Sequence, residues 1–395
     1  MKSMRLIAAF LFFSSIVLFL KAADGEDVVK SFKVDKGGTL KISLMNGSIS
    51  IDTWNKNEVN ISIENVDDSQ KNLLSFGQTG NNVTVKFDGS GSYGSTEVRV
   101  SVPSEFNLIL QTNKGDIKLS NNLKGNIQID TKSGDITLAS VNGYLKALTY
   151  GGDINLSSLS GNAEVSTYGG DITTGNINGN LELSTMGGDI ETKNISGKAN
   201  IVTKGGTISL MNIGKDLKAK TNGGDVIVGD VGGSVDISTL GGSIHAKKIS
   251  GNATLKTNGG NIKLLGASGS TIARTFGGNL ELYNITGNVD ANTNSGDIYI
   301  ELKPSSSGSS SISSMNGGVK LFIDPSAKVT INAVAYGVKY GESIADYIKS
   351  DFPIKRSDDS EYSSSAKGTV ILNGGGSTIN IRSDNDRIEI RKLKK

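Results

Sequence analysis

Hydrophobic and polar residues alternate along the middle of this chain, and the alternation repeats every 18 residues. One position of the repeat is apolar throughout, occupied by Leu145, Ala163, Leu181, Ala199, Leu217, Val235 and Ala253. The next position is polar, occupied by Lys146, Glu164, Glu182, Asn200, Lys218 and Asp236, and the one after it is apolar again. Alternation with a period of two is typical of a β-strand with one buried face.

A second apolar set follows in each repeat and predicts a second strand. It consists of Ile154, Ile172, Ile190, Ile208, Val226 and Ile244, and a further aliphatic column comprises Leu159, Ile177, Ile195, Ile213, Val231 and Ile249. Glycine recurs about every nine residues, at 152 and 161, 170 and 179, and 188 and 197. Tight turns and close backbone approaches require glycine. Each repeat is therefore predicted to contain two strands and two turns.

The turn motif keeps the period without slippage. It reads Thr, any residue, usually Gly-Gly, a small polar residue and an aliphatic one, with Thr at 131, 149, 167, 185, 203, 221, 239, 257, 275 and 293. A short fixed period without insertions indicates a solenoid of stacked coils. We therefore expect an all-β, single-stranded parallel β-helix with 18-residue coils and irregular β caps, right-handed by the general crossover preference. Ten coils spaced by about 4.8 Å would form a rod roughly 45 to 50 Å long.

Two other solenoids with 18-residue coils do not fit the pattern. A left-handed hexapeptide coil needs an aliphatic residue every six positions, but Ser160 and Ser166 follow Ile154 at that spacing. A calcium β-roll carries a Gly-Gly-x-Gly-x-Asp turn, whereas here Gly-Gly is followed directly by Asp and Ile. We expect a solenoid that folds without calcium or any other cofactor.

The pattern divides the chain into four segments: a signal peptide at 1–23, an N-terminal β cap with the first coils at 24–110, regular repeats at 111–302 and irregular coils with a cap at 303–395. The first motif, at Thr112, precedes the next by 19 residues. Polar stretches at 67–80, 304–311 and 357–367 are predicted to be loops, and 341–350 is predicted to hold a short helix. Atypical ends cover the open core of a solenoid.

The N-terminal sequence predicts export. Lys2 and Arg5 precede fifteen mostly apolar residues from Leu6 to Leu20, as in a secretory signal peptide. Lys21 makes the cleavage site imperfect, so a short uncleaved anchor is the alternative, although the apolar stretch is shorter than a usual span. We expect the periplasm, cell surface or extracellular space, with no stable membrane span in the mature chain.

Composition excludes several classes of function. The net charge is +2, from 41 basic and 39 acidic residues, so nucleic acid is not an expected partner. The chain has no cysteine, which excludes disulfides, thiolate metal sites and a lipidated cysteine. His245 is the sole histidine and falls in an outward column, which argues against histidine-based metal sites and triads. No catalytic, cofactor-binding or metal-binding residues are predicted.

Two polar columns have structural explanations. The Thr column, from Thr131 to Thr293, is in register with inward positions and is expected to form hydrogen-bonded ladders. The column after the glycines holds Asp116, Asp135, Asp153, Asp171 and Asp189, then Thr207, Asp225, Ser243, Asn261, Asn279 and Asp297. Asp after Gly is an ordinary turn residue whose carboxylate accepts backbone N–H groups.

The candidate contact site is the column just before the Gly pair, where Tyr150, Tyr168 and Met186 follow one another in successive coils. Neighbouring side chains in a column stand about 4.8 Å apart, so this strip would suit a sugar ring or a partner's surface. The alternative is that the rings stack on each other and merely shield the turns.

The layout resembles a family of bacterial envelope proteins known as putative adhesins with β-strand repeats. The resemblance rests on the segment 40–54 with Asn46-Gly47-Ser48-Ile49, on the Gly-Asp-Ile repeats, and on Ser350 to Pro353 followed by Gly374 to Ser377. It implies no catalytic residues. We expect a secreted or cell-surface structural or adhesin-like module without catalysis that contacts a glycan or a surface protein; the alternative is an envelope protein that binds or modifies polysaccharide.

Overall fold

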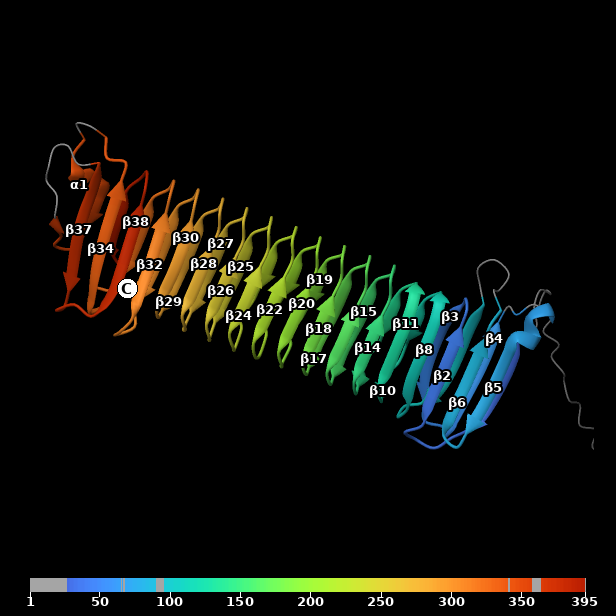
Figure 1. Cartoon of the computed structure of the whole chain (residues 1–395). Coiled ribbons are helices and arrows are strands. Elements are labelled where there is room, and N and C mark those ends of the chain that lie inside the picture. The colour runs from blue at the N-terminus through green and yellow to red at the C-terminus, as the bar shows by residue number, and fades with distance from the viewer. Residues whose placement is uncertain are drawn as a thin grey trace, which may run out of the picture.

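The computed structural model describes residues 27–64, 66, 68–89, 96–339, 342–356 and 364–394. It is an elongated rod built almost entirely of β-strands that follow one another along its length (Figure 1). Within the described residues the helices are short: the 3-10 helix η1 (Asp68–Leu73) and the α-helix α1 (Ile344–Tyr347). The predicted helix near 341–350 is therefore present, as a single turn. The expected all-β class is confirmed.

One long sheet, here called sheet B, contains the strand that follows the turn at Gly161 and the equivalent turn of each other repeat. In spatial order its strands are β5 (Leu74–Thr79), β6 (Asn82–Phe87), β2 (Thr39–Leu44), β8 (Asn107–Lys114), β11 (Ile127–Ser133), β14 (Leu145–Leu148), β16 (Ala163–Ser166), β18 (Leu181–Ser184), β20 (Ala199–Val202), β22 (Leu217–Lys220), β24 (Val235–Ser238), β26 (Ala253–Lys256), β28 (Thr271–Arg274), β30 (Val289–Thr293), β32 (Ser309–Ser314), β38 (Ser377–Ser383), β34 (Val329–Tyr336), β37 (Ser365–Leu372) and β36 (Lys355–Arg356).

The other long sheet, sheet A, contains the strand that follows the Thr-x-Gly-Gly turn. Its strands are β1 (Val28–Lys33), β4 (Glu58–Glu64), β7 (Glu97–Pro103), β3 (Ser48–Trp54), β9 (Ile117–Leu119), β10 (Leu123–Lys124), β12 (Ile136–Leu138), β13 (Val141–Asn142), β15 (Ile154–Ser160), β17 (Ile172–Asn178), β19 (Ile190–Thr192), β21 (Ile208–Leu210), β23 (Val226–Val228), β25 (Ile244–Ile249), β27 (Ile262–Ala267), β29 (Leu280–Thr286), β31 (Ile298–Lys303), β33 (Val319–Ile323), β39 (Ile388–Lys392) and β35 (Ile348–Ser350).

In the regular part of both sheets each strand pairs in parallel with the strand one repeat away. Ile154 pairs with Ile172 in sheet A, and Ala163 pairs with Leu181 in sheet B, each 18 positions on. The 19-residue first interval is also present, since Thr112 pairs with Thr131. The repeat period therefore equals the strand register, as the sequence predicts.

The core lies between the two sheets and consists of the predicted apolar columns. Ile154, Ile172, Ile190 and Ile208 are at most 1% exposed. The Thr column is also buried: the Oγ1 atom of Thr167 donates to the carbonyl of Gly152 at 2.9 Å and accepts from the N–H of Gly170 at 3.3 Å. Each buried hydroxyl in this ladder therefore has partners, and burying it costs little.

Glycine at the second position of each Thr-x-Gly-Gly turn is required by close approach of the backbone. A Cβ atom at Gly170 would lie 2.2 Å from the carbonyl oxygen of Gly152, while one at Gly169 would lie no nearer than 3.6 Å to any atom outside its own turn. At this turn, stacking thus requires the second glycine and leaves room for a Cβ atom at the first.

At both ends the chain departs from simple stacking (Figure 1). Strand β2 lies between β6 and β8, and β3 lies between β7 and β9. Strands β5 and β6 therefore lie outside β2 in sheet B, and β1, β4 and β7 lie outside β3 in sheet A. At the other end β38 and β39 lie in the same way, between β32 and β34 and between β33 and β35. Antiparallel pairs close both ends, β5–β6 and β1–β4–β7 at one and β34–β37–β36 at the other.

Three predicted loops are partly wrong. The stretch 67–80 contains η1, which has no buried residue, and β5, whose apolar alternation is limited to the half-buried Leu74 and Phe76. The stretch 304–311 ends in β32, where Ser310 is buried, and the stretch 357–367 ends in β37; residues 357–363 lie outside the described part of the chain. Serine-rich strands escape a search based on hydrophobic alternation.

The predicted signal peptide, 1–23, lies outside the described residues. Within the described ranges, no helix has the length and apolar character needed to cross a membrane.

Candidate functional site

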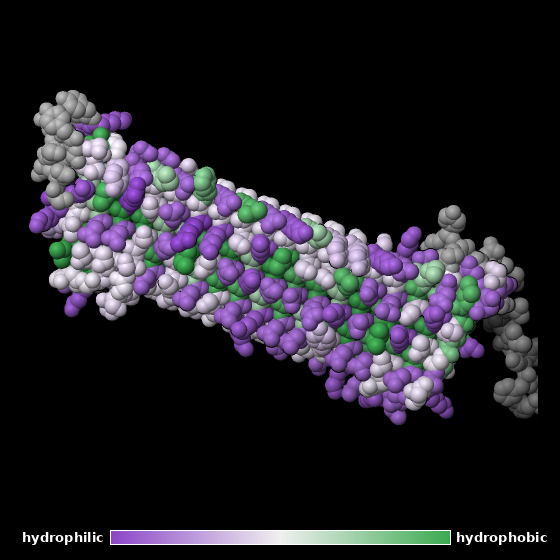
Figure 2. All heavy atoms as spheres, viewed as in Figure 1, coloured by the Kyte–Doolittle hydropathy of each residue, from purple (hydrophilic) through white to green (hydrophobic). Residues whose placement is uncertain are grey.

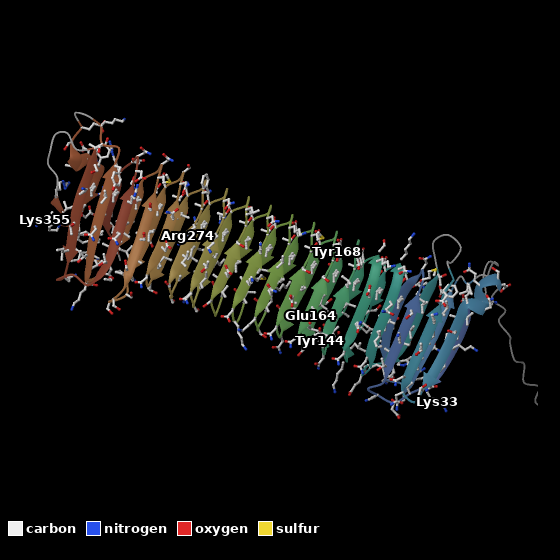
Figure 3. All side chains as sticks on the ribbon, in the orientation of Figure 1. Lys33, Tyr144, Glu164, Tyr168, Arg274 and Lys355 are labelled. Atoms are coloured by element: carbon white, nitrogen blue, oxygen red, sulfur yellow. The ribbon has the colours of Figure 1, made fainter. Side chains whose placement is uncertain are left out.

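The predicted contact residues lie together at the turns that join sheet B to sheet A. Tyr150, Tyr168 and Met186 are 47%, 48% and 42% exposed. The rings of Tyr150 and Tyr168 are stacked, with centroids 4.7 Å apart and planes 2° from parallel. Figure 3 places Tyr168 along the upper edge of the rod. The three residues therefore form one continuous, exposed strip, here called the tyrosine strip.

The backbone fixes the spacing of the tyrosine strip. The carbonyl of Tyr150 accepts from the N–H of Gly169 at 3.1 Å, and the carbonyl of Tyr168 accepts from the N–H groups of Met186 and Gly187, both at 3.2 Å. Each turn is thus hydrogen-bonded to the next, and the side chains above it are held at the spacing of the sheet. A ligand would meet a surface that is already organised, which lowers the entropic cost of binding.

Lysines flank the tyrosine strip at both ends. Lys132 occupies the same column one repeat before Tyr150, and Lys204 occupies it one repeat after Met186; both are exposed. Further along the column, Leu240 (53% exposed) and Phe276 (63% exposed) are separated by Asn258. Figure 2 shows this edge as single hydrophobic residues between polar ones. Contiguous apolar surface in this column is therefore confined to the tyrosine strip.

The aspartate column is a structural ladder, as predicted. The Oδ1 atom of Asp135 accepts from the N–H of Asp153 at 2.9 Å, and Asp153 and Asp171 accept from the N–H of the next Asp at 2.8 Å. The carboxylates of this column therefore link successive turns by hydrogen bonds. Among the described residues, no group of three or more His, Cys, Asp or Glu side chains is arranged to hold a metal ion.

Charged residues on the outer face of sheet B pair across repeats. Lys146 and Glu164 lie 3.1 Å apart, and Figure 3 shows Glu164 beside Tyr144 on this face. Hydrogen bonds from Tyr144 and then from Lys146 hold the pKa of Glu164 below its ordinary value. His245 is exposed on sheet A, as expected. These side chains are solvated surface groups with ordinary partners.

A row of aromatic residues on sheet A was not predicted from the sequence. Tyr283, Tyr299 and Phe322 lie with successive ring centroids 5.1 and 5.0 Å apart. Burial, followed by the hydrogen bond to Glu301 (3.0 Å), raises the pKa of Tyr299 to about 12. The row falls where the register shifts between Leu282 and Ile285, so the 18-residue period does not align its members.

A groove on sheet A was also not predicted. It has a volume of about 1190 Å³ and crosses eight repeats, from the level of Leu123 to that of Lys248. It lies where the strands break their alternation, since the inward residues Leu156 and Leu159 are three positions apart instead of two. The three-residue interval between inward residues recurs in successive coils, and this recurrence is the feature of the sequence that could have indicated the groove.

The chain is similar to one protein family and to several solved structures. A family model described as Toastrack DUF4097 matches residues 38–252, more than half of the chain, in agreement with the resemblance inferred from the repeats. A "putative adhesin" from Bacteroides fragilis NCTC 9343 shares 19% identity over 60% of this chain and 97% of that one, at a TM-score of 0.35.

Two structures from Parabacteroides distasonis ATCC 8503 are similar over longer parts of the chain. A "putative adhesin" shares 12% identity over 75% of this chain and 98% of that one, at a TM-score of 0.25. A "putative lipid binding protein" shares 14% identity over 76% of this chain and 97% of that one, at a TM-score of 0.20. No match was found among curated proteins.

Proposed function

Because the chain belongs to the Toastrack DUF4097 family, we propose that it is an exported, adhesin-like module that acts without catalysis as a rigid element of the cell surface. The observation that carries the proposal is the tyrosine strip, an exposed and ordered apolar surface on a scaffold of hydrogen-bonded repeats. Rigid scaffolds that present fixed aromatic side chains are suited to binding because little freedom is lost on contact.

Export is supported by the N-terminal sequence, in which Lys2 and Arg5 precede an apolar stretch from 6 to 20. The absence of cysteine throughout the sequence is compatible with an oxidising environment. On this proposal residues 1–23 are a signal peptide, 24–110 form the N-terminal cap with the first coils, 111–302 form the regular repeats, and 303–395 form the C-terminal cap.

The repeats are proposed to wind as one single-stranded, right-handed parallel helix. The alternation of sheet A and sheet B strands along the chain supports this, because each repeat contributes one turn of the path. The right hand follows from the twist of β-strands, which governs crossover connections between parallel strands.

The tyrosine strip is proposed to contact a glycan or a surface protein of the partner cell. Tyr rings offer an apolar face to a sugar ring or to aliphatic side chains, and their hydroxyl groups form hydrogen bonds at the rim. Lys132 and Lys204 would favour a partner with acidic or polar groups beyond the apolar contact.

The test is the double variant Tyr150→Ser with Tyr168→Ser, assayed for adhesion to cells and to a glycan array, with the fold checked by circular dichroism. Adhesion should fall roughly tenfold or more, since aromatic anchors at interfaces each contribute on the order of 1 kcal/mol or more. The matched control is Leu240→Ser with Phe276→Ser, which removes two isolated apolar residues from the same column. Unchanged adhesion by a folded tyrosine variant would exclude the strip as the contact site.

Polysaccharide binding is a second candidate function, and the groove on sheet A favours it. The groove lies at the far end of the sheet A strands from the Thr-x-Gly-Gly turns, so the two sites are separate on the surface.

A further inference from the structure

We propose that the groove on sheet A binds a linear, uncharged, β-linked glycan in extended form, with one sugar unit above each repeat. This inference deepens the polysaccharide-binding candidate and is independent of the tyrosine strip. The groove is shallow, spans eight repeats and is roughly 34 Å long at the usual strand spacing. Such a shape fits a polymer better than a compact ligand.

The two rims of the groove carry short side chains with amide and hydroxyl groups. One rim holds Ser158, Asn176, Asn194 and Asn212. The opposite rim holds Ser160, Asn178 and Ser196. These groups both donate and accept hydrogen bonds, which matches the hydroxyl groups along the edges of a sugar.

The rim side chains are already ordered by bonds to one another. Asn212 donates through Nδ2 to Oδ1 of Asn194 at 2.8 Å, and Asn194 donates in the same way to Asn176 at 3.1 Å. On the opposite rim, Oγ of Ser196 donates to Oδ1 of Asn178 at 3.0 Å. Each amide keeps a second N–H for a ligand, because an amide nitrogen carries two.

Charge favours a neutral occupant. The rims are uncharged from the level of Ser140 to that of Gly214, and charged residues line the groove at its two ends: Lys124 at one, Asp230 and Lys248 at the other. An acidic polymer would find no compensating cations along most of its length, so neutral sugars are preferred.

An extended peptide does not fit the groove. The backbone of the floor is already paired between repeats: Ile177 N–H donates to the carbonyl of Asn194 at 2.8 Å, and Ser196 N–H donates to the carbonyl of Ile177 at 2.9 Å. Strand addition needs free backbone groups. A peptide also repeats its side-chain direction every two residues, roughly 6.8 Å, which does not match a strand spacing of about 4.8 Å.

An acyl chain is not favoured either. The aliphatic side chains beneath the floor, such as Leu159, Ile177 and Ile195, are at most 2% exposed, so they offer little apolar cover. A sugar unit of an extended β-linked chain, by contrast, advances by about the spacing between parallel strands. Successive units of an extended β-1,4-linked chain face in opposite directions, so alternate units present the same edge to the same rim. Both rims carry amide and hydroxyl groups, and each unit can therefore form hydrogen bonds in either orientation.

The experiment measures binding of neutral β-1,4-linked glucose oligomers of increasing length to the purified exported chain by calorimetry. Affinity should rise with each added unit and level off near eight units, the number of repeats that the groove crosses. Asn178→Ala with Ser196→Ala should weaken binding roughly tenfold to a hundredfold, because it removes two hydrogen-bonding groups from one rim. Ser160→Trp should weaken it further by filling the groove.

The matched control is Glu182→Ala with Asn200→Ala, an exposed hydrogen-bonded pair in the same repeats but on sheet B (3.2 Å). Its affinity should equal that of the unchanged chain, as should that of the tyrosine double variant. The inference is overturned if the oligomers do not bind, if the rim variants bind as well as the control, or if a polyuronate, an uncharged peptide or a fatty acid binds more tightly. Adhesion measured separately on the tyrosine variant would still report on the proposed function.

Discussion

Single residues divide sharply between the inward and outward columns of this rod. Ile172, Ile190 and Ile208 pair with one another in successive strands of sheet A and are at most 1% exposed. Lys193, three residues beyond Ile190, is exposed. A charge is therefore tolerated or not according to the column in which it falls.

Ile190→Asp tests this division. The substitution places an unpaired carboxylate among aliphatic side chains and should destabilise the fold by about 4 kcal/mol or more. Secreted yield should collapse, and the denaturant midpoint of any recovered protein should fall. Lys193→Asp, a comparable change in an exposed column, should leave both unchanged. Equal stability of the two variants would contradict the column assignment.

The turn is the structural element on which stacking depends, and its two glycines have different roles. A Cβ atom at the second position would overlap the backbone of the preceding turn, whereas one at Gly169, a first position, would be in ordinary van der Waals contact. Because the ladder of Thr, Gly and Asp bonds runs through every turn, a displaced turn disturbs the repeats on both sides of it.

Gly170→Ala and Gly169→Ala form a matched pair that tests these roles. Gly170→Ala brings its Cβ within 2.2 Å of the Gly152 carbonyl, so the turns must move apart, at a cost of about 1–3 kcal/mol. Gly169→Ala meets no atom outside its own turn within 3.6 Å and should change stability by less than about 1 kcal/mol. Thermal unfolding of both variants measures the difference, and an equal loss would refute the close-approach argument.

At the scale of the whole molecule, each end is built from strands that are distant in sequence. Leu40 of β2 pairs with Leu108 of β8, and Ile312 of β32 pairs with Ile381 of β38. The last strands of the chain therefore lie inside the stack and connect the regular repeats to the C-terminal cap.

Deleting residues 377–395 should separate that cap from the rod. Strands β34 and β35 would lose their parallel partners β38 and β39, and the edges of β32 and β33 would be exposed. Exposed strand edges promote association between chains. The truncated chain should aggregate in light scattering and lose protection from proteolysis near its end, whereas removal of Lys394 and Lys395 alone should have neither effect. A monomeric, protected truncation would show that β38 and β39 are dispensable.

The sequence by itself determined the repeat. Alternation of side chains, glycines at the turns and the register of 18 are local properties, so the inward columns, the Thr and Asp ladders and the alignment of Tyr150 with Tyr168 could all be predicted. The candidate contact strip follows from the same period, because residues in one column stack when parallel strands pair in register.

Only the tertiary structure determined the arrangement of the strands at the two ends and the groove on sheet A. These features depend on pairing between strands distant in sequence and on bends in the backbone. Strand β2 pairs with β8, which is distant in the sequence. This pairing depends on which strand edges are available at the end of the rod, and the repeat period does not predict it. Strand β5 and the serine-rich β32 contribute few apolar side chains to the core, and pairing with neighbouring strands fixes their positions. The groove arises because the strands of sheet A bend between Leu156 and Leu159, and only the stacking of that bend over successive repeats makes it continuous.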